Sequence, residues 1–120
     1  MDRDAAEAFV GVWAATTAAP VLSEADVTAC IDQALTVDAD GYLVTDDGYT
    51  ETVDGNRAVY AAWALKVARA VATVDVSGDG TSVAGSQFVA ALERQRRVWL
   101  ARCVPASGGD EADDDVWFTG

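Results

Sequence analysis

The chain has 120 residues and a mass of 12.5 kDa, which is enough for one domain that buries its own core without disulfides or metals. Its 20 acidic and 8 basic residues give a net charge of −12. This balance disfavours binding of the whole protein to nucleic acid or to anionic membranes, because both surfaces would repel it. The chain has no histidine, so the usual general base and the commonest metal ligand are missing.

The kind of charge is as informative as its amount. Asp outnumbers Glu by 15 to 5, and Arg outnumbers Lys by 7 to 1. In molar salt the Debye length falls to about 3 Å, so repulsion between surface carboxylates nearly vanishes. This composition resembles that of proteins from salt-loving archaea. The alternative is an ordinary acidic protein from a bacterium with a GC-rich genome.

The charge is polarised along the chain. Residues 57–104 carry a balance of +4, whereas the rest of the chain carries −16. The N-terminus is acidic where a signal peptide is basic, and no apolar run approaches the roughly 20 residues of a membrane span. Cys30 and Cys103 lie at helix-like positions and are expected to be buried free thiols. We therefore expect a protein made in the cytosol and not bound to a membrane.

The first predicted helix covers residues 4–18. This segment is rich in alanine and places Phe9, Val10 and Trp13 at helical spacing. Pro20 follows and ends the segment, because proline cannot continue a helix without losing a hydrogen bond.

The second predicted helix covers residues 23–37. Ser23 is a good N-cap, and Asp26 three residues later forms a pair with it that resembles a capping box. A single apolar stripe then follows the helical spacing. It consists of Val27, Cys30, Ile31, Ala34 and Leu35.

Residues 38–55 change in character, because three Asp-Gly turn signals occur within 16 residues. The strand-prone segments 42–45 and 49–53 flank a short turn, and we expect them to form a β-hairpin. The acidic residues here lack the spacing of a calcium-binding EF-hand loop. Turn formation explains them better than metal binding does.

Two more helices are expected, with a second hairpin between them. Residues 56–74 form an alanine-rich helix that Asn56 can cap, and residues 74–85 read as strand, turn and strand. The apolar side of this helix consists of Val59, Tyr60, Trp63, Val67 and Val71.

The last helix is expected at residues 87–103, with Ser86 as its cap and Pro105 as its stop. Its expected buried face consists of Phe88, Val89, Leu92, Trp99, Leu100 and Cys103. The elements together predict a mainly α protein, a small helical bundle of three to four helices with one or two short β-hairpins.

The last helix is also basic, since it carries Arg94, Arg96, Arg97 and Arg102. These residues form either a solvated face with ion pairs inside the chain or a contact with an acidic surface of another protein or with passing DNA. Guanidinium groups suit such contacts, because they bond carboxylates with two parallel hydrogen bonds and are easily desolvated.

Residues 105–120 read as a flexible acidic tail with an apolar end. The apolar triplet Val116-Trp117-Phe118 follows a run of acidic residues. Exposed aromatic residues are a liability in a monomer, so two interpretations remain open. The triplet either folds back on its own core or docks on a partner.

No arrangement in the sequence favours catalysis. The chain has no Gly-rich phosphate loop, and without histidine it has no Cys-His or Ser-His pair. Its acidic residues lie in expected loops, termini and solvated helix faces. We therefore expect no enzymatic activity, no cofactor and no metal.

The order of helix, loop, alanine-rich helix, hairpin and basic helix resembles the head–tail connector proteins (adaptor, or head-completion, proteins) of long-tailed phages and archaeal tailed viruses. Residues 21–35 look like the start of the family's first helix, and residues 59–72 look like its alanine-rich second helix. Residues 75–83, with the basic run at 94–97, look like its hairpin and closing helix. The combination covers roughly residues 21–104 and points, with the composition, to a tailed virus of a haloarchaeon.

The chain departs from the family's common pattern at both ends and in the middle. The resemblance implies a helical adaptor domain at 21–104, preceded by an N-terminal helical extension at 1–20 and followed by the acidic tail at 105–120. The segment 38–55 is longer than is usual in the family.

The resemblance implies a virion protein of the neck, assembled in the host cytoplasm. Such adaptors form a ring, typically twelvefold, under the portal protein, extend the DNA channel and support the next neck or tail protein. Genomic DNA would pass through without specific binding. We expect the tail to dock on the portal or a neighbouring subunit through Val116, Trp117 and Phe118. We expect acidic surfaces of neighbouring subunits to meet Arg94, Arg96, Arg97 and Arg102.

Two alternatives remain open. A small acidic regulator, or a DNA mimic that inhibits a basic protein, would have the same net charge. A head-closure or tail-completion protein would share the neck location, but such proteins tend to contain more β-structure than the helical pattern here predicts.

Overall fold

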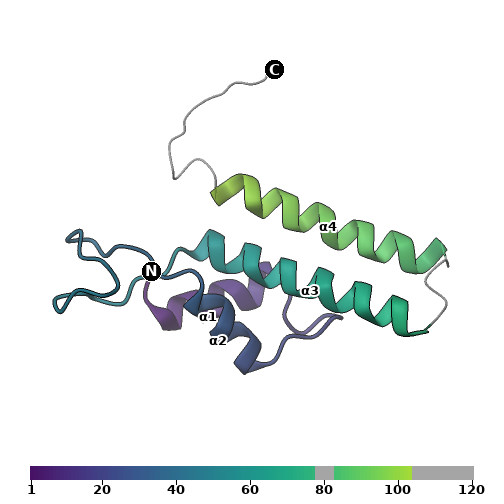
Figure 1. Ribbon diagram of the computed structural model, residues 1–120, viewed down its shortest axis with the longest axis horizontal. Helices are drawn as coiled ribbons and strands as arrows, with labels where there is room; N and C mark the ends of the chain where they lie inside the picture. The colour runs from purple at the N-terminus through teal and green to yellow at the C-terminus, as the bar shows by residue number, and fades with distance from the viewer. Residues whose placement is uncertain (78–82, 104–120) are drawn as a thin grey trace, which may run out of the picture.

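The fold is mainly α-helical, as the sequence predicts. The computed structural model describes residues 1–77 and 83–103, and in these ranges it has no strand. It contains the helices α1 (Arg3–Trp13), α2 (Glu24–Asp32), α3 (Gly55–Ser77) and α4 (Val83–Cys103). Helices α3 and α4 run antiparallel side by side, and α1 and α2 lie against α3 on its other side (Figure 1).

Helix α1 begins at an aspartate cap and ends in a left-handed turn. The Asp2 carboxylate accepts the N–H of Ala5 at 2.8 Å, which satisfies one free donor of the first turn. The helix ends at Trp13, and Ala15 then has a φ of +48°. This left-handed conformation stops the helix well before residue 18, the end that the sequence predicts.

Helix α2 has the capping box that Ser23 and Asp26 predict. The Asp26 N–H donates to the Ser23 hydroxyl at 3.2 Å, and the Ser23 N–H donates to the Asp26 carboxylate at 2.8 Å. The helix ends at Asp32, short of the expected residue 37. It ends there because the chain becomes extended, and Leu35 forms an isolated antiparallel bridge with Val53.

The hairpin expected at 38–55 is not observed, because one carboxylate organises this loop instead. Asp38 is only 6% exposed, and its two oxygens accept the backbone N–H groups of Asp40, Tyr42 and Thr50, each at 2.9 Å. Bonds from a side chain to the backbone thus replace the ladder that two paired strands would form.

The base of the same loop is tied to the start of the chain. The Val53 N–H donates to the Met1 carbonyl at 2.7 Å, and the Met1 nitrogen donates to the Val53 carbonyl at 3.0 Å. The Tyr49 hydroxyl donates to the Thr36 carbonyl at 2.7 Å. These bonds hold the loop beside the first turn of α1.

The second expected hairpin, at 74–85, is also not observed. Residues 74–77 form the last turn of α3, and residues 83–85 form the first turn of α4, so neither part is a strand. The central part of the expected hairpin, at 78–82, lies outside the described residues.

Both helix caps expected in the second half of the chain are wrong. Helix α3 begins at Gly55, and the carboxylate that accepts a first-turn N–H is that of Asp54, from Arg57 at 3.3 Å. Asn56 is therefore inside the helix. Helix α4 begins at Val83, so Ser86 lies inside it and is not its cap.

The core lies where α1, α2 and α4 meet α3. Small side chains dominate it, which allows the helices to approach closely. The buried apolar residues are Ala6, Val10, Ala14, Leu22, Cys30, Ile31, Ala34, Val53, Ala58, Val59, Ala62, Trp63, Ala70, Leu92 and Trp99.

Some residues of the expected buried faces are exposed instead. Val71 is 41% exposed, Phe88 43% and Leu100 39%. The reason is that α4 packs mainly on α3, so both helices keep an uncovered side. Both cysteines are free, but only Cys30 is buried, and Cys103 is half-buried.

Candidate protein-interaction surfaces

The four arginines of the basic helix do not form one patch. Arg94 and Arg97 are exposed, and no carboxylate of residues 1–77 or 83–103 lies within ion-pair distance of their guanidinium groups. Arg96 instead bonds to Glu93 one turn earlier, and this hydrogen bond raises the pKa of the Arg96 guanidinium. Arg94 and Arg97 are thus the two that remain open for a partner.

Arg102 belongs to an aromatic cluster at the end of α4. Its guanidinium lies 4.3 Å from the centre of the Trp99 ring, a cation–π contact. Trp99 in turn packs edge-on against Phe9, with 6.1 Å between ring centres, and at a tilt against Trp13, with 5.9 Å between ring centres. Trp13 is 51% exposed and Val12 is 72% exposed, so the cluster continues as an apolar surface of α1.

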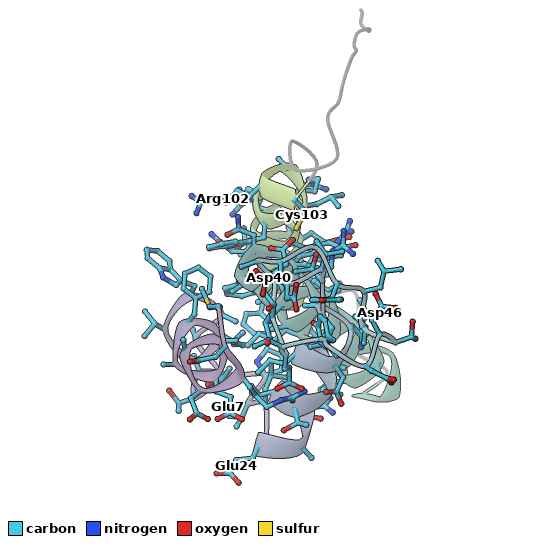
Figure 2. The ribbon with its side chains drawn as sticks, turned by 90° about the vertical axis from the view of Figure 1, so that its left-hand side faces the viewer. Glu7, Glu24, Asp40, Asp46, Arg102 and Cys103 are labelled. Atoms are coloured by element: carbon cyan, nitrogen blue, oxygen red, sulfur yellow. The ribbon has the colours of Figure 1, made fainter. Side chains whose placement is uncertain are left out.

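A groove lies at the same end of α4 but on a different side from the aromatic cluster around Trp99. Figure 2 shows that Arg102 and Cys103 leave this end in different directions, and Cys103 lines the groove. The groove has a volume of about 690 Å³ and lies between α3, α4 and the end of α2. Its lining is mostly apolar and consists of Gln33, Arg57, Tyr60, Ala61, Ala64, Leu65, Leu100 and Cys103.

The expected docking residues Val116, Trp117 and Phe118 lie outside the described residues. Their role stays a prediction. What the structure adds is the place where their segment starts, because Cys103 is the last described residue and lines the groove.

Lys66 is buried, with 1% of its surface exposed. Its ammonium group donates to the carbonyls of Ala15 at 2.6 Å and Ala18 at 3.1 Å, and it lies 5.0 Å from the centre of the Trp63 ring. Burial lowers the pKa of the amine. The cation thus binds the turn after α1, where the negative end of the helix dipole favours a positive charge.

Asp38 is the second buried charged group in the described residues. Its hydrogen bonds from backbone N–H groups, with that of Thr50 first, lower the pKa of its carboxyl group. Lys66 and Asp38 both use their charge to hold backbone groups of turns. The sequence offers no hint of either role.

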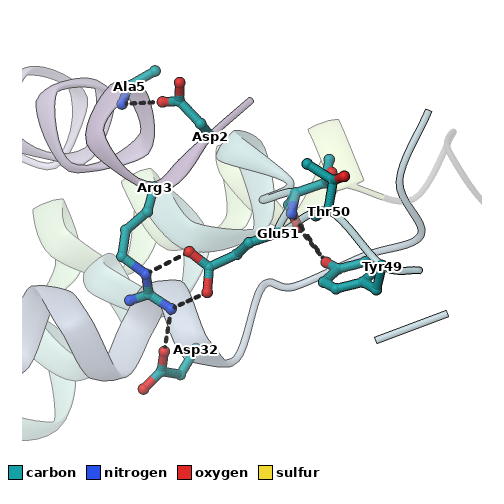
Figure 3. A network of polar contacts seen from close by, with 8 residues as sticks. Asp2, Arg3, Ala5, Asp32, Tyr49, Thr50 and Glu51 are labelled. Carbon is teal, nitrogen blue, oxygen red and sulfur yellow. Dashed lines mark hydrogen bonds and ion pairs between the residues drawn. The ribbon is translucent and has the colours of Figure 1, made fainter. Parts of the chain in front are cut away.

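Two clamps join segments that are distant in sequence. The Arg3 guanidinium bonds to Glu51 at 2.9 Å and to Asp32 at 2.7 Å, which lowers the pKa of Glu51 and raises that of Arg3 (Figure 3). Arg69 bonds to both oxygens of Asp26, at 2.6 and 2.8 Å, and holds the pKa of that carboxyl group well below its usual range. Both clamps are partly exposed, so each contributes little to stability.

The described residues contain no group of three acidic or cysteine side chains that could hold a metal ion. Burial raises the pKa of both thiols, Cys30 and Cys103. Among the four helices, none combines the length and apolarity that are needed to cross a membrane.

Comparisons of the chain with protein-family models, with curated proteins and with solved structures find no match. The surfaces described above are therefore interpreted from their own chemistry.

The groove has a sequence signal of its own, a second stripe of residues on α3. Helix α3 carries two stripes, and the one that faces the core contains Val59 and Trp63. The second stripe has the same helical spacing and consists of Arg57, Tyr60, Ala61, Ala64 and Leu65. Of these, only Tyr60 belongs to the apolar side of the helix that the sequence predicts. Alanines between larger residues on a helix do not by themselves indicate a binding surface, but here Ala61 and Ala64 form part of the floor of a groove.

Proposed function

We propose that this chain is a structural, non-catalytic adaptor in the head–tail connector of a tailed virus. In this role it forms a ring under the portal protein, extends the DNA channel and carries the next neck or tail protein. The observation that supports a role in assembly is the outer face of α4, where Arg94 and Arg97 are exposed without an acidic partner in the described residues.

A ring needs two unlike surfaces on each copy, because its contacts are heterologous and must close. The second surface is acidic. The loop between α2 and α3 exposes Asp40, Asp46 and Asp47, and Figure 2 shows Asp40 and Asp46 at its surface. We propose that this loop of one copy meets the arginines of α4 of the next, which suits the bidentate bonding of guanidinium to carboxylate.

The overall charge fits a channel through which DNA slides. A chain with a net charge of −12 has no overall electrostatic attraction for the phosphate backbone at any salt concentration, so DNA passes without sticking. The excess of aspartate further suggests assembly in high salt, where a basic face and an acidic loop still bind when the pair is desolvated. This points to a virus of a haloarchaeon.

The arginine contact is tested by changing Arg94 and Arg97 to serine. We expect the variant to fold, since both residues are exposed and form no ion pair in the described residues, and to lose ring assembly on portal-bearing capsids in high salt. A Gln95→Ser variant changes an exposed residue of the same helix and serves as the control. Normal assembly of the arginine variant would show that the proposed contact is wrong.

The C-terminal contact is tested by removing residues 105–120. The truncated chain keeps every described helix and is expected to lose attachment to portal-bearing capsids through the loss of Val116, Trp117 and Phe118. Removal of Thr119 and Gly120 alone is the control and should leave attachment unchanged. If the truncated chain attaches normally, the tail is not the docking segment.

A regulator that binds a basic protein is the second candidate. The exposed carboxylates of the loop between α2 and α3 support it, because clustered acids can imitate a phosphate backbone. The two proposals differ in what the chain binds. A DNA mimic copurifies as a monomer or dimer with a nuclease or other DNA-binding protein, whereas an adaptor is found in virions.

A further inference from the structure

The groove between α3 and α4 is an apolar surface that no described segment covers. Leu100 is 39% exposed at its edge, and Ala61, Ala64 and Leu65 form its floor. A groove of about 690 Å³ is within the range that proteins use to bind compact ligands and side chains. An uncovered apolar groove of this size is typical of a binding site for another segment or molecule.

The charge at the groove narrows the choice of occupant. Arg57 is the one cationic residue among those that line it, and the described residues place no carboxylate within ion-pair distance of its guanidinium. The occupant should therefore combine apolar side chains with negative charge.

The chain itself contains such a segment. Five of the six residues at 110–115 are acidic, and Val116, Trp117 and Phe118 follow them directly. We propose that in the free chain this apolar triplet occupies the groove between α3 and α4, with the acids before it close to Arg57. The inference is independent of the adaptor role, since it concerns the chain before any partner binds.

The length of the connection permits this contact. Cys103 lines the groove, and 12 residues separate it from Val116. A coil of that length spans about 20 Å on average, at roughly 5–6 Å times the square root of the number of residues. Such a tether also holds the segment near the groove at an effective concentration on the order of 1 mM, so even weak binding fills the groove.

The alkylation rate of the Cys103 thiol can report whether the groove is occupied. Cys103 is half-buried at the groove, whereas the other thiol, Cys30, is 1% exposed inside the core. Alkylation of the native full-length chain with N-ethylmaleimide, followed by digestion and mass spectrometry, gives the rate at Cys103 alone. A segment docked nine-tenths of the time lowers this rate about tenfold, because only the open fraction reacts.

The decisive variant is Trp117→Ser with Phe118→Ser, which keeps every acidic residue. We expect it to raise the alkylation rate at Cys103 about tenfold, on the same open-fraction argument. Thr119→Ala is the matched control in the same segment and should leave the rate unchanged. Equal rates in the full-length chain and in the double variant would overturn the proposal.

A variant of the groove gives an independent check. Leu100→Asp should raise the alkylation rate as the double variant does, and the two changes together should add nothing further, since both empty the same groove. Additive effects would place the triplet elsewhere and overturn the proposal. Circular dichroism verifies that each variant keeps its helices.

The concentration of the protein separates the chain's own segment from that of a second copy. Protection of Cys103 by its own segment does not depend on protein concentration. Protection that grows with concentration would identify the segment of another copy as the occupant, and would contradict the proposal. Because neither result involves capsids, failure here is distinct from failure of the adaptor role.

Discussion

Lys66 shows how far a single residue can depart from what the sequence suggests. As the only lysine of an acidic chain, it reads as a solvated surface residue. Its place on α3, three residues after the buried Trp63, instead directs it inward. The carbonyls that bind it belong to the turn after α1, and this partner could not be predicted because the turn itself was expected to be helical.

We predict that Lys66→Met lowers the free energy of unfolding by about 1–3 kcal/mol, because the turn after α1 loses the two hydrogen bonds that the buried ammonium group donates to the carbonyls of Ala15 and Ala18. Methionine keeps the length and most of the volume of the side chain, so packing changes little. Urea unfolding followed by circular dichroism measures the difference.

The control is Gln95→Met at an exposed position of α4, with an expected change within about 0.5 kcal/mol. A Lys66→Met variant that is as stable as the parent would mean that the buried ammonium group does not hold the turn.

Carboxyl groups with a lowered pKa make the protein sensitive to acid. The pKa values of Asp26, Asp38 and Glu51 all lie below their ordinary values of 3.8 to 4.5. Their contribution to stability is complete above those ordinary values and is lost as the pH falls toward the lowered ones. We predict that stability decreases as the pH falls below 4.5, measured by thermal unfolding across pH values.

The Asp26→Asn variant should show a weaker dependence on pH in this window, since it no longer binds a proton when the clamp with Arg69 opens. Asp47→Asn changes an exposed acid in the loop between α2 and α3 and should keep the dependence of the parent. The same slope in both variants would exclude Asp26 as one of the groups responsible.

At the scale of elements, all four helices could be predicted from the sequence, but only some of their ends could, namely the start of α2 after Ser23 and the end of α4 at Cys103. All four helices lie where apolar spacing predicts them, because that spacing reflects a buried face. Where a helix begins depends on which nearby side chain can accept the free N–H groups of its first turn. Ser23 caps α2 because Asp26 completes a reciprocal pair, whereas Ser86 has no such partner and α4 simply begins earlier, at Val83.

The two serines provide a matched test of this difference. We predict that Ser23→Ala costs about 1 kcal/mol of stability, because the first turn of α2 loses its cap. Ser86→Ala should be neutral or slightly stabilising, since alanine is the better helix former inside a helix. Chemical unfolding measures the free energy of unfolding of both variants. A larger loss of stability for Ser86→Ala than for Ser23→Ala would contradict the observed start of α4.

The exposed parts of α4 also could not be predicted. Trp99 and Leu100 both read as members of one buried face, yet Trp99 is 3% exposed and Leu100 39%. The difference arises from what lies beside them, since Phe9 and Trp13 of α1 cover Trp99 and nothing described covers Leu100. Apolar spacing gives the direction of a side chain, but only the arrangement of helices gives its cover.

At the scale of the whole molecule, the composition indicates the salt concentration in which the protein works, but it does not identify a binding partner. The net charge of −12 favours high salt because self-repulsion is then screened. We predict that the melting temperature rises by several degrees between 0.1 and 2 M KCl, where about 1 kcal/mol corresponds to roughly 4 °C or more. Differential scanning calorimetry measures this rise.

A variant with Asp40→Asn and Asp47→Asn should be more stable than the parent at low salt and should depend less on salt. Both acids lie at the surface of the loop between α2 and α3, so their loss relieves repulsion. A melting temperature of the parent that falls with KCl would contradict the screening argument.

The proposed adaptor role is tested most directly by locating the protein in the virion. The most direct measurement is quantitative mass spectrometry of tailed virions purified in molar salt, combined with cryo-electron microscopy of their necks. We predict that the chain is present in a fixed small number of copies, as a ring between the portal and the tail. Absence of the chain from the virions, or its presence only with a basic protein in cell extracts, would contradict the proposed role.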